Sequence, residues 1–328
     1  MLSKKVLMSL ALVILLIVGT TLAGCGPGEE RIVLATGGTG GVYYPLGGAM
    51  ADIWSEHIDE ISASSESTGA SVENVNLVHY GESHLGLIQN DITYYAFHQD
   101  EMFSPEGDEA VDEPLNKLRW VAGLYPEVIQ VIADADAGIE TVSDLEGMRI
   151  AVGAPGSGHE ANARQILQAH GFDYDDFATV DFIMHTEAVD AVRDGHLDAY
   201  FTTAGIPTAS AVDIFTTHDV NLVAIEMDMV SEIIDTWPFY AEFTVPAGTY
   251  SGQDEPVETV AVMATLVVNE DVDEDLVYNM TKVMFENLDR LRATHERAND
   301  ITLDTALEGQ SVDLHPGAQR YYEEEGIL

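Results

Sequence analysis

Short β-rich apolar runs alternate with amphipathic, helix-like segments along the chain as far as about residue 225. This alternation is typical of α/β lobes built on mostly parallel sheets. Strands are expected at Ile32–Ala35, Leu85–Ile88, Trp120–Tyr125, Ile129–Ala133, Arg149–Val152, Val180–Ile183, Ala199–Thr202 and Val220–Ile225. Helices are expected at Tyr44–His57, Val72–Tyr80, Asn162–His170, Ala188–Arg193 and, within a helix-rich C-terminal part, Thr281–Arg292. The pattern predicts the α/β class.

Two apolar segments, Gln130–Asp136 and Thr259–Asn269, are predicted to cross between two lobes. A chain that leaves one lobe and later returns to it forms a discontinuous domain. We expect lobe I to comprise residues 31–135 plus 256–328, and lobe II to comprise residues 136–255. A ligand is expected in the cleft between them.

Two glycine-rich turns, residues 37–41 and 153–158, each lie between a strand-like run and a helix-like run. Such a turn directs bare backbone N–H groups and the positive end of a helix dipole toward a ligand, and so holds a carboxylate or phosphate without Lys or Arg. Either turn alone is also compatible with a simple connector. Because two occur in equivalent places, they indicate a clamp to which each lobe supplies one turn.

The N-terminus has the pattern of an export signal. A basic start precedes the apolar run Val6–Val18, which is too short to span a membrane, and Leu22–Cys25 contains small residues. This ending resembles a lipobox, in which Cys25 is lipidated and begins the mature chain. We expect a lipoprotein signal peptide at 1–24 and a lipidated tether at 25–30. An uncleaved membrane anchor with an incidental cysteine is the alternative.

Acidic residues greatly outnumber basic ones: 57 Asp and Glu against 13 Lys and Arg give a formal net charge of −44 at pH 7. Because 46% of the residues are hydrophobic, the composition is that of a folded protein with an acidic surface rather than a disordered acidic tail. Such a surface disfavours nucleic acid and anionic membranes as partners. High salt would screen the self-repulsion, and we hypothesise a halophilic source.

Several catalytic and metal-binding patterns are incomplete. Cys25 is the only cysteine, which excludes disulfides and, in the mature domain, cysteine-based zinc or nucleophilic sites. His159 and Glu160 begin a zincin motif whose second histidine is replaced by Ala163. Ser157 lacks the flanking glycines of a nucleophile elbow, and no suitably placed acidic residue supports a dinucleotide turn here. We expect no catalytic residue, no metal and no cofactor.

Seven segments, in order along nearly the whole mature chain, carry a resemblance to a known family. They are Thr36–Gly47, Ser67–Asn74, Leu87–Asp91, Gly153–Glu160, Asp198–Pro207, Thr249–Gln253 and His315–Gly326. Together they resemble the TAXI class of solute receptors, which serve TRAP (tripartite ATP-independent periplasmic) transporters. The resemblance implies a type II periplasmic-binding-protein fold with two lobes and a central ligand cleft. It also implies delivery of a small organic anion, in this class glutamate, glutamine or a related C5 carboxylate, to membrane permease subunits that run on an ion gradient.

Carried over position by position, the resemblance implies a ring of donors and acceptors around the ligand. These are Thr39, Gly40, Tyr43, Ser67, Thr68, Gln89, Gly156, Ser157, Gly158, His159, Thr202 and Thr203. Hydroxyl and amide groups hold a carboxylate by directed hydrogen bonds, and an analogue that lacks one partner leaves a buried group unpaired. The set therefore predicts specificity through geometry.

His159 departs from the family, whose members more often carry a small hydroxyl residue at this position. As an imidazolium it would pair with an anionic ligand; alternatively, it caps a helix or bridges the lobes. The remaining scattered histidines are interpreted as surface or capping residues: His57, His79, His84, His98, His170, His185 and His196. The rings at 94–95 and 237–240 are interpreted mainly as core packing, with lining of the cleft as the alternative.

The sequence thus predicts a monomeric, extracytoplasmic, lipid-anchored receptor that is not an enzyme. It binds a small carboxylate and hands it to a TRAP membrane permease, and it is held at the membrane through the lipid on Cys25. A sensory protein that presents its ligand to a signalling partner is one alternative. A secreted enzyme acting on small carboxylates is the other, and it lacks a convincing pair of base and nucleophile.

Overall fold

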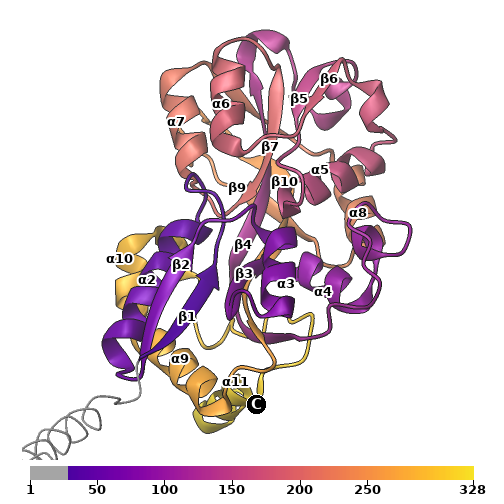
Figure 1. Cartoon of the computed structure of the whole chain (residues 1–328). Helices are drawn as coiled ribbons and strands as arrows, with labels where there is room; N and C mark the ends of the chain where they lie inside the picture. The colour runs from indigo at the N-terminus through magenta and orange to yellow at the C-terminus, as the bar shows by residue number, and fades with distance from the viewer. Residues whose placement is uncertain (1–28) are drawn as a thin grey trace, which may run out of the picture.

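The computed structural model describes residues 29–328, so the predicted signal peptide and Cys25 lie outside the described residues. Two bodies of strands and helices lie one above the other, and two long strands, β4 and β10, run between them (Figure 1). No helix within residues 29–328 is long and apolar enough to cross a membrane.

The strands and helices alternate along the chain, as the apolar pattern predicts. The strands are β1 (Glu30–Ala35), β2 (Ile61–Glu66), β3 (Leu85–Gln89), β4 (Leu118–Asp134), β5 (Arg149–Ala151), β6 (Thr179–Asp181), β7 (Ala199–Ala204), β8 (Val220–Val223), β9 (Ala241–Val245) and β10 (Val257–Asn269). The helices are α2 (Tyr43–His57), α3 (Ser71–Tyr80), α4 (Asn90–His98), α5 (Gly158–Ala169), α6 (His185–Arg193), α7 (Ala209–Thr217), α8 (Met227–Thr236), α9 (Glu274–Glu286), α10 (Leu288–Thr294) and α11 (Pro316–Glu325).

One ten-stranded sheet runs through the described part of the chain, in the order β2-β1-β3-β10-β4-β7-β5-β6, with β8 beside β4 and β9 beside β10. Pairing is parallel at both ends, where β1 lies between β2 and β3, and β5 lies between β6 and β7. The pairs made by the long strands β4 and β10 are antiparallel. The α/β class is confirmed, with parallel pairing in the outer part of each lobe.

Strand β4 is continuous over 17 residues, although the sequence pattern predicts two strands on either side of Pro126. Proline has no N–H group to donate to a neighbouring strand, and it usually marks an interruption. Here Pro126 lies opposite Met263 of β10, and the register of the pair shifts at the next step, between Ala264 and Thr265. The predicted break was wrong: Pro126 is paired only with β10, since the pairing of β4 with β7 begins at Val128, and the strand continues through it.

Separate apolar cores fill the two lobes. Along β4, buried residues as far as Tyr125 pack into the core of lobe I, and those from Ile129 onward pack into the core of lobe II. Along β10, the same change falls between Val262 and Ala264. The middle of each long strand therefore lies between the lobes. The lobe boundaries at 135/136 and 255/256 remain a prediction.

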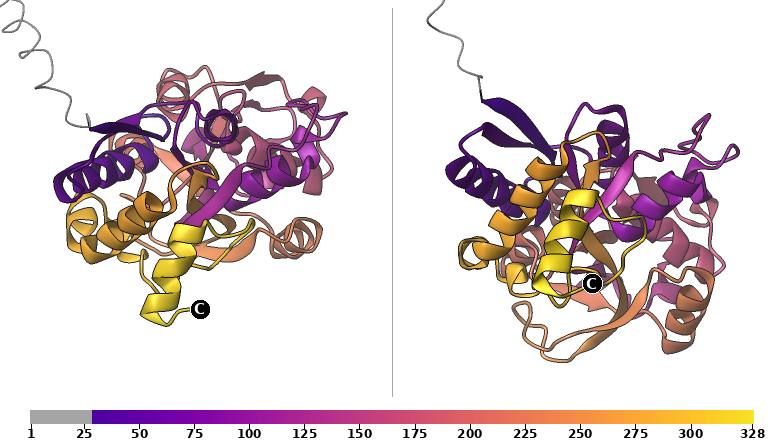
Figure 2. Two further views of the ribbon diagram at one scale, coloured as in Figure 1. Left: turned by 60° about the horizontal axis from the view of Figure 1, so that its bottom comes forward. Right: turned by 90° about the horizontal axis from the view of Figure 1, so that it is seen from below.

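At the end of lobe I, α9 and α10 pack against α2, and α11 packs against α9 (Figure 2). A single helix was expected over Thr281–Arg292, but α9 ends at Glu286 and α10 begins at Leu288. Between them, Asn287 donates its side-chain N–H to the carbonyl oxygen of Val283 at 2.8 Å. Asparagine competes in this way for backbone hydrogen bonds and so favours helix ends, which explains the break.

Before the helix-rich C-terminal part, five strands and α-helices have no counterpart in the expected pattern: β2, β9, α4, α7 and α8. Strands β2 and β9 are partly or largely exposed along most of their length, and β2 is rich in serine. β9 does alternate apolar and polar residues (Ala-Glu-Phe-Thr-Val), but both strands are short, and β2 carries only two apolar residues among six. Their pairing partners β1 and β10 define them instead.

The acidic surface leads to an expected dependence of stability on salt. Most arginines of the described chain already contact carboxylates, as Arg149 contacts Asp198 and Arg320 contacts both Glu274 and Asp275. Exposed pairs of this kind contribute little, so repulsion among the many remaining carboxylates dominates. Raising NaCl from about 0.1 M to about 1 M shortens the Debye length from ~10 Å to ~3 Å. We expect the melting temperature, followed by circular dichroism, to rise over this range.

The control for this prediction is an equally concentrated neutral osmolyte, which strengthens burial without screening charge. A melting temperature that is independent of NaCl would contradict the hypothesis of a halophilic source.

Candidate functional site

A narrow cavity lies where the first glycine-rich turn and the start of α2 meet the ends of α5, α6 and β7. Its volume is about 20 Å³, enough for roughly one water molecule. It is lined by Gly37, Gly38, Gly41, Val42, Tyr43, Ala70, Glu127, His159, Met184, His185, Thr203 and Ala204. These residues come from both lobes, so the structure has the lobes closed on each other.

The first glycine-rich turn lies directly against the start of α6. A Cβ atom on Gly38 would lie 2.5 Å from Met184 Cε, and one on Gly40 would lie 2.6 Å from Thr186 Cγ2. Both distances are shorter than real carbon contacts. At Gly40 the short Thr186 side chain would have to shift, so glycine there lets the two lobes approach closely, whereas at Gly38 the end of the flexible Met184 side chain could move aside.

Tyr43 and Glu127 form a buried pair in the cavity wall. Tyr43, the first residue of α2, donates its hydroxyl hydrogen to Glu127 Oε2 at 2.6 Å. Glu127 lies in the middle of β4 and is 4% exposed. Burial raises the pKa of Glu127 to about 8, although the hydrogen bond from Tyr43 acts in the opposite direction.

Tyr43 belongs to the set that the resemblance implies, whereas sequence reasoning missed Glu127. One glutamate among 57 acidic residues carries no signal of its own. The signal that was available is its place inside the apolar run that forms β4, because a carboxyl group in a buried strand needs a partner.

The rings of His159 and His185 lie next to each other in the cavity, tilted, with their centroids 4.8 Å apart and their planes at 34°. Burial lowers the pKa of His185 to about 4. Burial, together with the neighbouring His185, lowers the pKa of His159 well below its usual range. Both rings are therefore neutral at pH 7 in this cavity, which does not favour the imidazolium interpretation of His159.

The interpretation of His185 as a surface or capping residue was wrong. This side chain is 4% exposed, and its Nδ1 lies 3.3 Å from Thr202 Oγ1, while its Nε2 has no hydrogen-bond partner. The expected helix began at Ala188, but α6 begins at His185. The additional turn of helix brings the ring into the cavity.

Three predicted hydroxyl residues near the first turn do not line the cavity. Ser67 Oγ donates to the carbonyl oxygen of Gly37 at 2.8 Å, and Thr68 Oγ1 lies 3.1 Å from the carbonyl oxygen of Thr36. Thr39 is exposed at the tip of the turn. Ser67 and Thr68 therefore hold the backbone of the turn in place.

The second glycine-rich turn leads into α5. Ser157 Oγ accepts a hydrogen bond from the backbone N–H of Glu160 at 3.2 Å and so caps this helix. Gly156 has a φ of +72°, in the left-handed region that favours glycine. These two residues shape the turn, and His159, which follows them, lines the cavity.

A buried polar network joins the lobes beside the cavity. Gln89 Nε2 donates to Asn162 Oδ1 at 2.9 Å, and Asn162 Nδ2 donates to Asp91 Oδ2 at 3.0 Å and to the hydroxyl oxygen of Tyr240 at 2.8 Å. Gln89 and Asp91 belong to lobe I, whereas Asn162 and Tyr240 belong to lobe II. A Cβ atom on Gly158 would overlap Gln89 Oε1 and lie 2.5 Å from Gln89 Cδ. Gln89 and Gly158 thus contact each other across the closed cleft.

Only some of the residues predicted to contact the ligand line the cavity. Tyr43, His159 and Thr203 line the cavity, while Thr202 contacts His185 behind it. Thr39 is exposed at the tip of the first turn, and the others shape the two turns or join the lobes: Gly40, Ser67, Thr68, Gln89, Gly156, Ser157 and Gly158. Ligand contact by any of these residues stays a prediction.

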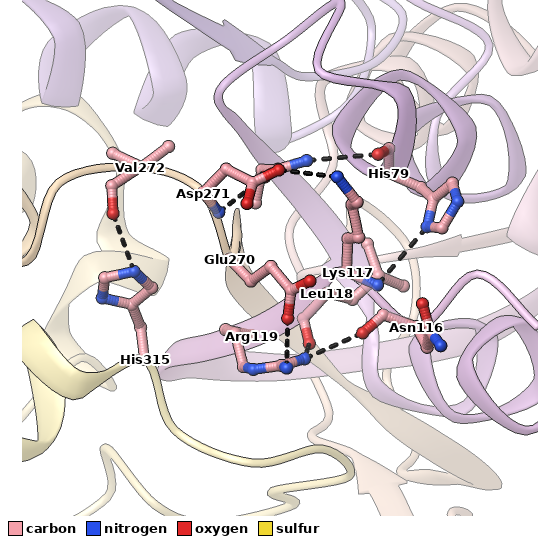
Figure 3. Close-up of polar contacts among 10 residues, drawn as sticks. His79, Asn116, Lys117, Leu118, Arg119, Glu270, Asp271, Val272 and His315 are labelled. Atoms are coloured by element: carbon pink, nitrogen blue, oxygen red, sulfur yellow. Dashed lines mark hydrogen bonds and ion pairs between the residues drawn. The ribbon is translucent and has the colours of Figure 1, made fainter.

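A second cluster of charged residues lies at the start of β4 and the end of β10 (Figure 3). Lys117 Nζ pairs with Asp271 at 2.6 Å, Arg119 pairs with Glu270, and His315 Nε2 contacts a backbone carbonyl. Because these groups are paired with each other, the cluster joins segments of lobe I. No group of three or more His, Cys, Asp or Glu side chains within residues 29–328 is arranged to hold a metal ion.

Comparison with known proteins identifies both a family and a fold. A family model described as the NMT1-like family matches residues 34–326. PhnD1 from Prochlorococcus marinus (MIT 9301), solved in complex with methylphosphonate, is similar with a TM-score of 0.56 and 11% identity, over 92% of this chain and 97% of that chain. A protein from Bordetella bronchiseptica RB50 is similar with a TM-score of 0.53 and 16% identity, over 90% and 82% of the two chains.

The periplasmic aliphatic sulphonate binding protein SsuA from Escherichia coli has a TM-score of 0.46 and 11% identity, over 90% of this chain and 79% of that chain. The type II periplasmic-binding-protein fold that was expected from the sequence is confirmed.

Proposed function

This chain belongs to the NMT1-like family, and we propose that it is an extracytoplasmic solute receptor of the TAXI class. It binds a small organic anion between its lobes and delivers it to a TRAP membrane permease. The observation that carries this proposal is the cavity itself. Its lining combines residues from both lobes, so a ligand bound there stabilises the closed arrangement that a permease would recognise.

We propose glutamate, glutamine or a related C5 carboxylate as the ligand. The first turn of α2 supports a carboxylate site, because no side chain caps this helix at Val42 and because Gly41, Val42 and Tyr43 line the cavity. Uncapped N–H groups at a helix start attract an anion. The cavity of about 20 Å³ is too small for such a ligand, so the lobes must separate to admit it and then close around it.

We also propose how the receptor is attached to the membrane and that it works as a monomer. The likeness of the N-terminus to a lipobox supports a signal peptide at 1–24 and attachment to a membrane through Cys25. The acidic surface favours a receptor that works as a monomer until it meets its permease.

Thermal-shift measurements test the ligand class. Adding glutamate, glutamine or 2-hydroxyglutarate to the purified protein in molar NaCl is expected to raise its melting temperature. A ligand that binds only the folded state stabilises it by about 2.7 kcal/mol when its concentration is 100 times Kd. Scanning fluorimetry over a range of ligand concentrations measures the shift.

Methylphosphonate, the ligand in the PhnD1 structure, and a simple alkanesulfonate serve as comparison compounds. A shift with one of these and none with any C5 acid would contradict the proposed ligand class while leaving a solute receptor in place. Consumption of the ligand during the measurement would favour an enzyme instead.

A further inference from the structure

The charged groups around the cavity do not suit a ligand that carries only negative charge. The lining contains one carboxyl group, that of Glu127, and no lysine or arginine. Its two imidazoles, on His159 and His185, are neutral at pH 7 because burial lowers the pKa of each. A purely anionic ligand would meet a buried acid and no full positive charge.

Glu127 lacks the cationic partner that a buried carboxylate requires. It is 4% exposed and accepts a hydrogen bond from the Tyr43 hydroxyl at 2.6 Å. The only other charged group that perturbs it is Asp91, which is also acidic and also raises its pKa. A buried acid without a cation is costly to ionise, so Glu127 holds its proton at pH 7 in this cavity. A cation that enters the cavity beside Glu127 would stabilise its ionised form and be bound by it.

The geometry points to that outside cation being the ammonium group of the ligand. We propose that Glu127 binds the ammonium group of an α-amino acid, and that the receptor thereby selects amino acids over the corresponding deaminated acids. This inference rests on the proposed function in using the interlobe cavity as the ligand site.

The positions of the two ends of such a ligand agree with this assignment. The start of α2, where no side chain caps the helix at Val42, suits the carboxylate, and Tyr43 is itself hydrogen-bonded to Glu127. The proposed carboxylate site at the start of α2 and the proposed ammonium site at Glu127 are therefore joined through the side chain of Tyr43. In an α-amino acid the carboxylate and the ammonium group are both bonded to the same carbon, Cα, so one ligand presents both groups close together.

The other cavity groups are available to the ligand side chain. His185 Nε2 lines the cavity, is buried and has no hydrogen-bond partner. A buried polar atom without a partner is costly, and a ligand amide or carboxyl group would satisfy it. The ammonium group and the side chain would then be recognised by different elements, β4 and α6.

Calorimetry with matched pairs of ligands tests the proposal. Each pair consists of an amino acid and the acid that lacks only its ammonium group: glutamate with glutarate, glutamine with 4-carbamoylbutanoate, aspartate with succinate, and leucine with 4-methylpentanoate. In molar NaCl, we expect the wild-type protein to bind the amino acid at least tenfold more tightly than its deaminated partner. In Glu127→Gln, that ratio should fall below about threefold.

Two control variants separate the role of the carboxyl group from a general disturbance. Glu242→Gln removes the same charge from an exposed position on β9 and should leave the ratio unchanged. Tyr43→Phe removes the hydrogen bond to Glu127 but keeps its carboxyl group, so the ammonium preference should persist even where the overall affinity falls. If Glu127→Gln does not fold, equal binding of each amino acid and its deaminated partner by the wild-type protein still overturns the proposal.

Each outcome bears on one of the two proposals. A preference seen only for aspartate or leucine supports the role of Glu127 and contradicts the C5 ligand class. Equal binding of glutamate and glutarate supports the C5 class and overturns the role of Glu127. A preference that survives in Glu127→Gln, or the absence of binding by every amino acid, also overturns it.

Discussion

Replacing Gly158 by alanine is expected to weaken ligand binding by roughly 10- to 100-fold. An alanine Cβ would overlap the side-chain oxygen of Gln89 from the opposite lobe and lie 2.5 Å from its Cδ. Gln89 is 1% exposed and bonded to Asn162, so it can move only by losing that bond or by keeping the lobes apart. Overpacking of this kind costs about 1–3 kcal/mol, and ~1.4 kcal/mol corresponds to a tenfold change in affinity.

The affinity of Gly158→Ala would be measured by calorimetry with the ligand found in the thermal-shift assay. The matched control is Gly48→Ala in α2, where the nearest atom to a new Cβ is Ser65 Oγ at 3.8 Å. Alanine there should leave affinity unchanged and stabilise the helix by about 0.5–1 kcal/mol. Wild-type affinity in Gly158→Ala would show that the lobes do not close on each other at this contact when the ligand is bound.

Replacing Asp91 by asparagine is expected to stabilise the ligand-free protein at pH 8 by up to about 3 kcal/mol. Burial raises the pKa of Asp91 from 3.8 to about 6, so the folded state binds its proton more tightly than the unfolded state does. Stability therefore falls as the pH rises from about 4 to about 6, and it stays lower above that range. Each pKa unit of difference between the folded and the unfolded state corresponds to about 1.36 kcal/mol, so raising the pKa of Asp91 from 3.8 to about 6 corresponds to ~3 kcal/mol.

Asparagine does not titrate, and its side-chain oxygen can still accept the hydrogen bond that Asn162 donates to Asp91 at 3.0 Å. The difference in the free energy of unfolding between Asp91→Asn and the wild type should therefore be small at pH 4 and large at pH 8. Urea denaturation in molar NaCl measures it. Asp304→Asn, at an exposed position, removes the same charge and should show no such growth with pH. A difference independent of pH would contradict the assigned cause.

The secondary structure near the cleft was predictable because its signals are local. The apolar run before each glycine-rich turn and the amphipathic segment after it are features of a few consecutive residues, and they correctly predicted β1, α2, β5 and the body of α5. The break expected at Pro126 was wrong for the opposite reason. Whether a proline interrupts a strand depends on its neighbours in the sheet, which lie far away in the chain.

The candidate site was predictable only in part. The resemblance implied Tyr43, His159 and Thr203, which line the cavity, but it also implied Thr39, which is exposed. The two turns indicated that the lobes meet, and the structure adds that the first turn lies against the start of α6. That contact could not be foreseen, because the start of α6 was expected three residues later than its position at His185.

By itself, the sequence determined the α/β class, the glycine-rich turns that let two lobes approach, and an acidic surface on a folded chain. Each of these depends on composition or on short-range pattern. Only the tertiary structure decided which polar groups meet in the cavity. Glu127 and Tyr43 are 84 positions apart, and Gln89 and Asn162 are 73 positions apart. Glu127 differs from the exposed acidic residues of this chain through its burial and its hydrogen bond from Tyr43, and both arise only in the folded protein.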